Sequence, residues 1–166
     1  MTSNLSTARF AVLINSETHI AEVILNRPKN MNSMDRPFFP EFYKIIKALD
    51  DDSQVFVIVI KSTPIDQCPH FSAGLDLKAV AGDLMGNGSE EESPAIGNLK
   101  LFGIITEMQN AFRILEKCKK PVIAAVNGLC IGGAIDLITA ADIRLCTKDA
   151  KFSIRETKVG ITADLG

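Results

Sequence analysis

Apolar residues gather in short β-rich segments near the start of the chain, and their spacing then becomes helical. Segments 10–14 and 20–25 are apolar, and the polar residues 15–19 between them predict a hairpin of two strands. After a polar break at residues 27–30, Asp35 can cap a helix. Apolar side chains follow at helical spacing, at Phe38, Phe42, Ile45 and Leu49. We therefore expect a hairpin followed by a helix that covers a sheet.

A continuous apolar run at residues 55–60 has the pattern of a buried strand. Strands that are buried on both faces read as uninterrupted apolar runs, so this segment is expected at the centre of a sheet, packed between two layers. A similar run at 121–126 predicts another buried strand, and residues 143–146 predict a shorter one. Strands that alternate with helices favour an α/β fold.

Two later segments have helical patterns, and a polar stretch precedes them. An apolar stripe predicts a long helix that ends at the lysine cluster 117–120, where cations suit a helix C-terminus. Its members are Leu101, Ile104, Ile105, Met108, Phe112 and Leu115. A second helix is predicted to open at residues 132–134 and to continue through Ala141. Residues 82–98 are rich in Gly, Ser and Glu, which predicts a mobile loop.

Composition narrows the class of protein. The 166 residues are 46% hydrophobic and 23% charged, which is ordinary for one soluble globular domain over residues 1–166. A net charge of -2 gives no general attraction to nucleic acid. No apolar stretch approaches the roughly 20 residues that a membrane span needs. An anionic ligand must therefore be held by a local site.

Missing motifs disfavour several kinds of chemistry. The four cysteines form no CxxC pair and two lie in apolar runs, which predicts reduced, buried thiols and no zinc site. No GxxxxGK(S/T) string supplies a phosphate-binding loop. No GxSxG elbow accompanies His19 or His70, so a Ser/His nucleophile is not expected. These residues imply no metal and no redox cofactor.

Two glycine-bearing turns offer a different kind of site. Each follows an apolar strand and leads into a helical segment, so each presents backbone N–H groups that favour negative charge. Two such donors that converge on one point form an oxyanion hole. We predict that the donors are the N–H groups of Leu75 and Gly133. Close packing alone is an alternative explanation for the adjacent Gly132 and Gly133.

Three carboxylates follow the second turn, at Asp136, Glu156 and Asp164. Each has a structural explanation, because Asp136 could complement a helix dipole, Glu156 could pair with Arg155, and Asp164 could cap a following element. Asp136, however, lies among apolar residues of a helix, where an ionised carboxylate is costly. Acids in such surroundings are often catalytic, so the neighbourhood favours a chemical role that the spacing alone leaves open.

Three segments together resemble the crotonase, or enoyl-CoA hydratase/isomerase, superfamily. They are HFSAGLDL at residues 70–77, KPVIAAVNG at 120–128 and CIGGAIDL at 130–137. The resemblance runs over nearly the whole chain and implies the crotonase-like fold, a spiral of ββα units. It implies that Leu75 and Gly133 bind the thioester oxygen. It also implies that the substrate's coenzyme A lies along Ser72, Ala73, Gly74, Leu75, Asp76 and Gly133.

The acids resemble those of one branch of this family, the Δ3,5-Δ2,4-dienoyl-CoA isomerases. Family hydratases are expected to have glutamates at the positions of Asp136 and Glu156 and no acid at that of Asp164. Asp164, in the tail 159–166, therefore carries this part of the resemblance. It implies that Glu156 exchanges the proton on carbon 2, that Asp164 serves carbon 6, and that Asp136 supports both. The roles of Glu156 and Asp164 could be exchanged.

The resemblance implies isomerisation of 3,5-dienoyl-CoA to 2,4-dienoyl-CoA in fatty-acid β-oxidation, with no cofactor besides the coenzyme A of the substrate. It implies a mitochondrial or peroxisomal location and, for full-length members, a homotrimer or hexamer. The family's C-terminal helical part is expected to be absent from this chain. Two alternatives stay open: an enoyl-CoA hydratase that uses Asp136 and Glu156, and a catalytically silent fragment that associates through exposed apolar helices.

Overall fold

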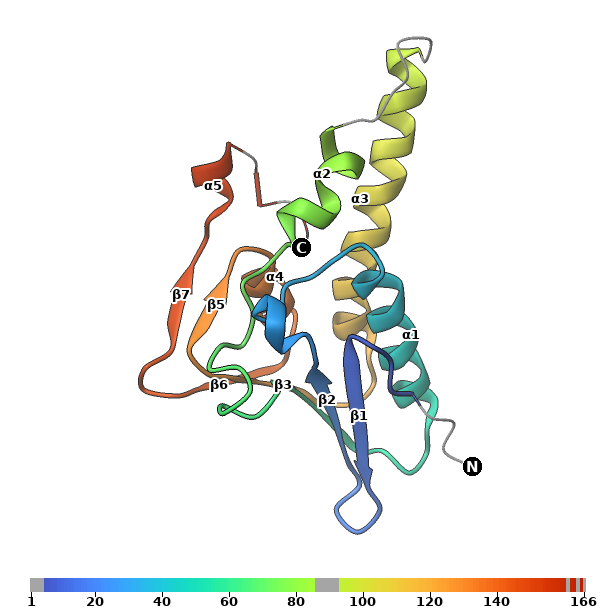
Figure 1. Cartoon of the computed structure of the whole chain (residues 1–166). Helices are drawn as coiled ribbons and strands as arrows, with labels where there is room; N and C mark the ends of the chain where they lie inside the picture. Colours follow the sequence, from blue (N-terminus) through green and yellow to red (C-terminus); the bar gives the residue numbers. More distant parts are fainter. Residues whose placement is uncertain (1–4, 86–92, 161, 164, 166) are drawn as a thin grey trace.

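A mixed five-stranded sheet forms one wall of the molecule (Figure 1). The computed structural model describes residues 5–85, 93–160, 162, 163 and 165. The strand order is β1-β2-β3-β4-β6, with β1 antiparallel to β2 and the other neighbours parallel. These strands are β1 (Phe10–Asn15), β2 (Ile20–Leu25), β3 (Val57–Ser62), β4 (Val122–Val126) and β6 (Ile143–Cys146). The predicted hairpin and the central place of the apolar run at 55–60 are both confirmed.

The prediction that this central strand is buried on both faces is wrong. Along β3 only alternate residues are buried, among them Ile58 and Ile60, while their neighbours stay partly exposed. Successive side chains of a strand point to opposite faces, so one face of the sheet is covered and the other is open. The apolar run at β3 therefore reflects two apolar faces, of which the described residues cover only one.

Helices α1 and α3 cover the buried face of the sheet (Figure 1). The helices are η1 (Pro28–Asn30), α1 (Phe38–Asp51), α2 (Leu77–Met85), α3 (Pro94–Lys117), α4 (Gly133–Thr139) and α5 (Glu156–Val159). Phenylalanines join these layers, since the ring centroids of Phe10 and Phe38 are 4.8 Å apart and those of Phe39 and Phe112 are 5.8 Å apart. Within the part of the chain that the structure describes, no helix is long and apolar enough to span a bilayer.

The predicted capping role of Asp35 is also wrong. Helix α1 begins after Pro37 without a side-chain cap, and the carboxylate of Asp35 instead accepts two hydrogen bonds from Arg9, at 2.7 and 2.9 Å. An arginine fork that matches both carboxylate oxygens is stronger than a single bond to a backbone N–H. Asp35 therefore ties the first strand to the start of the helix.

A second, smaller wall of the molecule consists of two short paired strands and two isolated bridges. Strand β5 (Leu129–Ile131) pairs in parallel with β7 (Lys151–Ser153), and single parallel bridges join Ser72 to Cys130 and Met34 to Leu75. Each strand of the large sheet after β1 is thus followed by a segment of this second wall and then by a helix. This order is the spiral of ββα units that the resemblance implied, and the α/β crotonase-like fold is confirmed.

The prediction of a loop over 82–98 is wrong at both ends of this segment, which are helical. Helix α2 extends to Met85 and helix α3 begins at Pro94, after Ser93. The remaining residues, 86–92, lie outside the described part of the chain. Both helices begin at residues that are typical of a helix N-terminus. Asp76, a common N-capping residue, precedes α2, and proline occupies the first position of α3.

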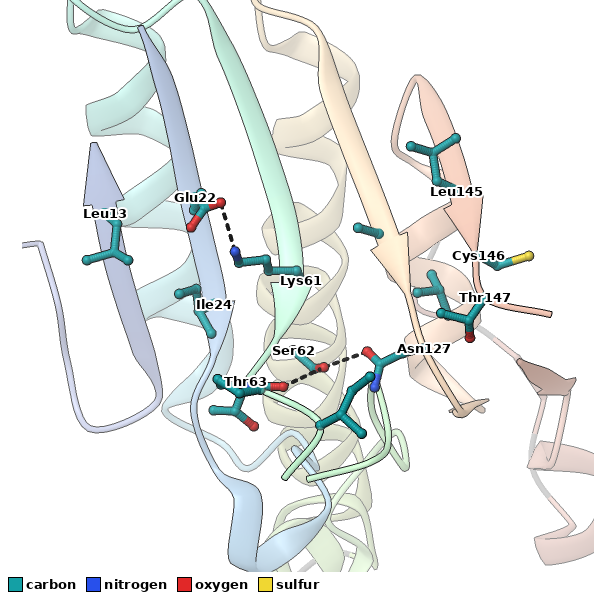
Figure 2. A pocket seen from close by; sticks show the side chains of 14 residues that line it. Leu13, Glu22, Ile24, Lys61, Ser62, Thr63, Asn127, Leu145, Cys146 and Thr147 are labelled. Atoms are coloured by element: carbon teal, nitrogen blue, oxygen red, sulfur yellow. Dashed lines mark hydrogen bonds and ion pairs between the residues drawn. The ribbon is translucent and has the colours of Figure 1, made fainter. Parts of the chain in front are cut away.

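The open face of the sheet carries a groove of about 620 Å³. Figure 2 shows side chains of β1, β2, β3 and β6 along it, among them Leu13, Ile24 and Leu145. Glu22 and Lys61 form an ion pair of 2.7 Å within this mainly apolar lining. All four residues of the edge strand β6 are exposed, and Leu145 is 58% exposed.

Thiol reactivity tests how open this edge is. Cys146 at the end of β6 is exposed, whereas Cys68 and Cys130 are buried and burial raises the pKa of Cys130 to about 12. Only exposed thiols with an accessible thiolate react quickly. We expect Ellman's reagent to modify Cys146 in the fastest phase and Cys130 only on unfolding. The Cys146→Ser variant should lose the fast phase, and slow labelling of Cys146 in the native chain would contradict the open edge.

Candidate active site

The two glycine-bearing turns predicted from the sequence lie against each other in the structure. A Cβ atom built on Gly74 would be 2.4 Å from the carbonyl oxygen of Ile131 and 3.3 Å from the backbone nitrogen of Gly133. Gly74 also has a φ of +82°, in a region that other residues rarely adopt. This position therefore needs glycine, both for its conformation and for the close approach of the two turns.

Backbone hydrogen bonds orient the N–H group of Leu75. The carbonyl of Gly74 accepts a bond of 2.8 Å from the N–H of Met34, and the N–H of Asp76 donates to the carbonyl of Met34 at 2.9 Å. The carbonyl of Gly74 and the N–H of Leu75 belong to one trans peptide group, so they point in opposite directions. The N–H of Leu75 is therefore directed away from Met34.

The second donor comes from the start of helix α4. Gly132 has a φ of +57° and its N–H donates to the carbonyl of Ser153 at 3.0 Å, which leaves Gly133 as the first helical residue. The N–H groups of a first helical turn have no partner inside the helix. Among the described residues, neither Leu75 nor Gly133 donates its N–H to a protein acceptor.

A small cavity lies where these two turns meet. Its volume is about 70 Å³, and its lining is Ala73, Leu75, Leu77, Ile131, Gly132, Gly133, Arg155 and Glu156. The structure thus brings both predicted oxyanion-hole residues and one predicted acid to a single cavity. The larger groove on the open face of the sheet shares no lining residue with it.

Glu156 is the acid of this cavity. It is only 8% exposed, and its Oε1 atom lies 3.0 Å from the place where a Cβ on Gly132 would be. Its Oε2 atom is buried and has no hydrogen-bond partner among the described residues. No ion pair of the described chain joins Glu156 to Arg155, so the surface-pair explanation is not supported. A buried carboxylate with an unused oxygen is available for proton transfer.

The other two predicted acids are placed differently. Asp136 lies in the first turn of α4, partly buried, and is not among the residues that line the cavity. Asp164 lies outside the described residues. Leu165, which follows it in sequence, is buried and has its Cδ1 atom 3.2 Å from the place of a Cβ on Gly133.

The residues predicted to contact coenzyme A divide into lining and supporting groups. Ala73 and Leu75 line the cavity, and Gly74 and Gly133 bring the two turns together. The side chain of Ser72 is fully buried, with its hydroxyl donating to the carbonyl of Asn32 at 2.8 Å and accepting the N–H of Gly74 at 3.1 Å. Its hydroxyl therefore stabilises the turn.

Sequence reasoning missed Arg27. Its Nη2 atom donates to Oδ2 of Asp76 at 3.1 Å, and its Nη1 atom donates to the carbonyl of Ser33. The partners Arg27 and Asp76 lie 49 positions apart, and no periodic pattern connects them.

Within the described residues, no group of three or more His, Cys, Asp or Glu side chains could hold a metal ion.

The chain is similar to curated isomerases and to solved structures of the same fold. Two relatives named Δ3,5-Δ2,4-dienoyl-CoA isomerase, a mitochondrial protein of Dictyostelium discoideum and a peroxisomal protein of Arabidopsis thaliana, are 44% and 40% identical over 92% of this chain. The chain spans about half of their length, 50% and 53%. A protein of Thermobifida fusca YX solved in complex with acetoacetyl-CoA is 26% identical, with a TM-score of 0.77 over 99% of this chain and 61% of that one.

A family model described as enoyl-CoA hydratase/isomerase matches residues 15–166. The matched region contains both glycine turns and all three predicted acids. The match accords with the ββα spiral and with the meeting of Leu75 and Gly133 at one cavity. The chain belongs to the enoyl-CoA hydratase/isomerase family.

Proposed function

We propose that this chain carries the reaction centre of a dienoyl-CoA isomerase, which converts 3,5-dienoyl-CoA to 2,4-dienoyl-CoA. The observation that carries the proposal is the cavity in which two unused N–H donors, of Leu75 and Gly133, lie beside the buried carboxylate of Glu156. Two donors suit a thioester oxygen that becomes negative, and a carboxylate suits a proton on carbon. The names of the two isomerase relatives support the choice of reaction.

The net reaction shifts a proton from carbon 2 to carbon 6 of one substrate molecule, with no oxidation or reduction. A carboxylate takes the proton from carbon 2, and the electron pair of that C–H bond passes into an extended enolate whose oxygen the Leu75 and Gly133 N–H groups stabilise. A carboxylic acid then protonates carbon 6, which leaves double bonds at carbons 2 and 4. The first acid then releases its proton and the second takes one up, directly or through water, which restores both groups for the next turnover. We assign the carbon-2 proton to Glu156, the carbon-6 proton to Asp164, and a supporting role to Asp136. Support for Asp164 is its place in sequence beside Leu165, which packs at Gly133.

An absorbance assay of the purified 166-residue chain with 3,5-dienoyl-CoA tests this proposal. We expect the absorbance of the 2,4-dienoyl product to rise, and the Asp164→Asn variant to be slower on the order of 10²-fold, because an amide cannot deliver the proton. Asp66→Asn, a change of the same type in the connection after β3, is the matched control and should keep the wild-type rate. A flat trace with acyl-CoA binding intact would contradict catalysis by this chain and favour a silent domain.

Hydration is the second activity that the family name includes. It would use Asp136 and Glu156 together on a 2-enoyl thioester, and only Glu156 lines the cavity. Our choice of isomerisation therefore rests on the names of the two isomerase relatives and on the presence of Asp164 in the sequence. Incubation with crotonyl-CoA separates the two reactions, because a hydratase would consume it and would be unaffected by Asp164→Asn.

The remaining features of the proposed function rest on the relatives. Their names place them in mitochondria or peroxisomes, and we propose one of these two locations for this protein. We propose that coenzyme A enters only as part of the substrate and that proton transfer needs no further cofactor. Assembly into a homotrimer or hexamer is proposed for the complete protein.

A further inference from the structure

A network of charged side chains lies beside the turn that carries Leu75. Its members are Arg9, Arg27, Asp35, Glu41 and Asp76, whose side chains are between 12% and 25% exposed. Two arginines thus face three carboxylates in a mostly buried setting, where charge pairs are screened less by water than at the surface. Arg27 is the member that connects the network to the turn, through its bond of 3.1 Å to Asp76.

Asp76 joins three parts of the structure. Its Oδ2 atom accepts from Arg27, while its Oδ1 atom accepts the N–H of Ala79 at 3.3 Å and so caps the first turn of helix α2. Its own N–H donates to the carbonyl of Met34 at 2.9 Å. Asp76 follows Leu75 directly, so the direction of the Leu75 N–H depends on how firmly Asp76 is held.

We propose that Arg27 is a positioning residue for the oxyanion hole, which it aligns through Asp76. This inference rests on the proposed function, because it assumes that the Leu75 N–H binds the thioester oxygen. Without Arg27, the carboxylate of Asp76 loses its cation and stays near Asp35, a like charge whose partner is then Arg9 alone. The carboxylate then keeps only the long bonds from the N–H of Ala79 and the hydroxyl of Ser33, at 3.3 and 3.5 Å, and the turn relaxes. A hydrogen bond weakens steeply as its angle departs from linearity, so a small tilt of this N–H weakens oxygen binding.

Two ligands that differ in the thioester carbonyl isolate this effect. Acetoacetyl-CoA carries the carbonyl, while free CoA offers the same nucleotide and pantetheine without it. In isothermal titration calorimetry, Arg27→Gln should raise the Kd for acetoacetyl-CoA about tenfold, because a hole donor is misaligned and not removed. The Kd for CoA should stay unchanged. A merely structural role for Arg27 would weaken both ligands equally.

Three further variants make the test specific. Arg9→Gln is the matched control, because it removes the other cation of the network without a contact to Asp76, and it should leave both Kd values unchanged. Asp76→Asn keeps an N-capping side chain but loses the ion pair, so it should also raise the Kd for acetoacetyl-CoA, even if Arg27→Gln folds poorly. Arg27→Lys keeps the charge without the fork, and an intermediate Kd is expected.

The outcomes separate this inference from the proposed function. Equal weakening of both ligands in Arg27→Gln, or an unchanged Kd for acetoacetyl-CoA in Asp76→Asn, would overturn the positioning role alone. A carbonyl-selective loss in Arg9→Gln would also overturn it, because the effect would then belong to the network as a whole. A wild-type chain that binds neither ligand would overturn the proposed function and, with it, this inference.

Discussion

Replacement of Glu156 by Gln is expected to lower kcat for isomerisation of 3,5-dienoyl-CoA by about 10²- to 10⁴-fold, the usual contribution of a general base. The amide has the shape of the carboxylate and fits beside Gly132, but it cannot accept the carbon-2 proton. KM and the Kd for acetoacetyl-CoA should change little, because the N–H donors of Leu75 and Gly133 remain in place. The absorbance assay and calorimetry measure the two quantities separately.

The unfolding temperature of the Glu156→Gln variant gives an independent test of this role. The Oε2 atom of Glu156 is buried without a hydrogen-bond partner among the described residues, and an ionised carboxylate in such a place is costly. Glu156→Gln should therefore unfold at an equal or higher temperature than the wild type. Glu107→Gln is the control, since Glu107 is a surface residue paired with Arg36 and should not affect kcat. A Glu156→Gln variant that loses stability and keeps its rate would identify Glu156 as a structural residue.

Local patterns predicted the elements of the fold well, because each depends on a few neighbouring residues. The hairpin 10–25 follows from two apolar segments with polar residues between them, and the end of α3 at Lys117 follows from helical apolar spacing and a basic cluster. Strands β5 and β7 were missed, because each has three residues and too few positions for alternation. The covered and open faces of the large sheet could not be read either, since an apolar run does not record what packs against it.

Long-range contacts explain the successes and failures at the site. The two glycine-bearing turns and then the resemblance led to Leu75 and Gly133 as a pair, and the structure brings them together because Gly74 permits backbone contact with Ile131. Asp35 was assigned as a cap because a cap is local, but its partner Arg9 lies 26 positions away. Arg27 was missed for the same reason. Pairing of distant charges depends on the folded topology, which no local spacing reveals.

Gly74→Ala is expected to disrupt the site more widely than any change of an acid. The new Cβ would lie 2.4 Å from the carbonyl oxygen of Ile131, a backbone atom that cannot move aside cheaply, and alanine would be strained at a φ of +82°. Strain of this kind costs about 1–3 kcal/mol before the clash is counted. Separation of the two turns also moves Leu75 away from Gly133. We expect a lower melting temperature together with loss of both isomerisation and acetoacetyl-CoA binding.

Gly103→Ala is the matched control, because it is the same substitution in helix α3 with no atom within 4 Å of the new Cβ. Alanine is favoured over glycine inside a helix by roughly 0.5–1 kcal/mol, so this variant should melt at a higher temperature and keep its activity. Thermal unfolding followed by circular dichroism compares the two. The opposite outcome is a Gly74→Ala variant with wild-type stability and wild-type ligand binding. It would show that the two turns can separate while the ligand still binds. The pairing of Leu75 with Gly133 would then not be the basis of the site.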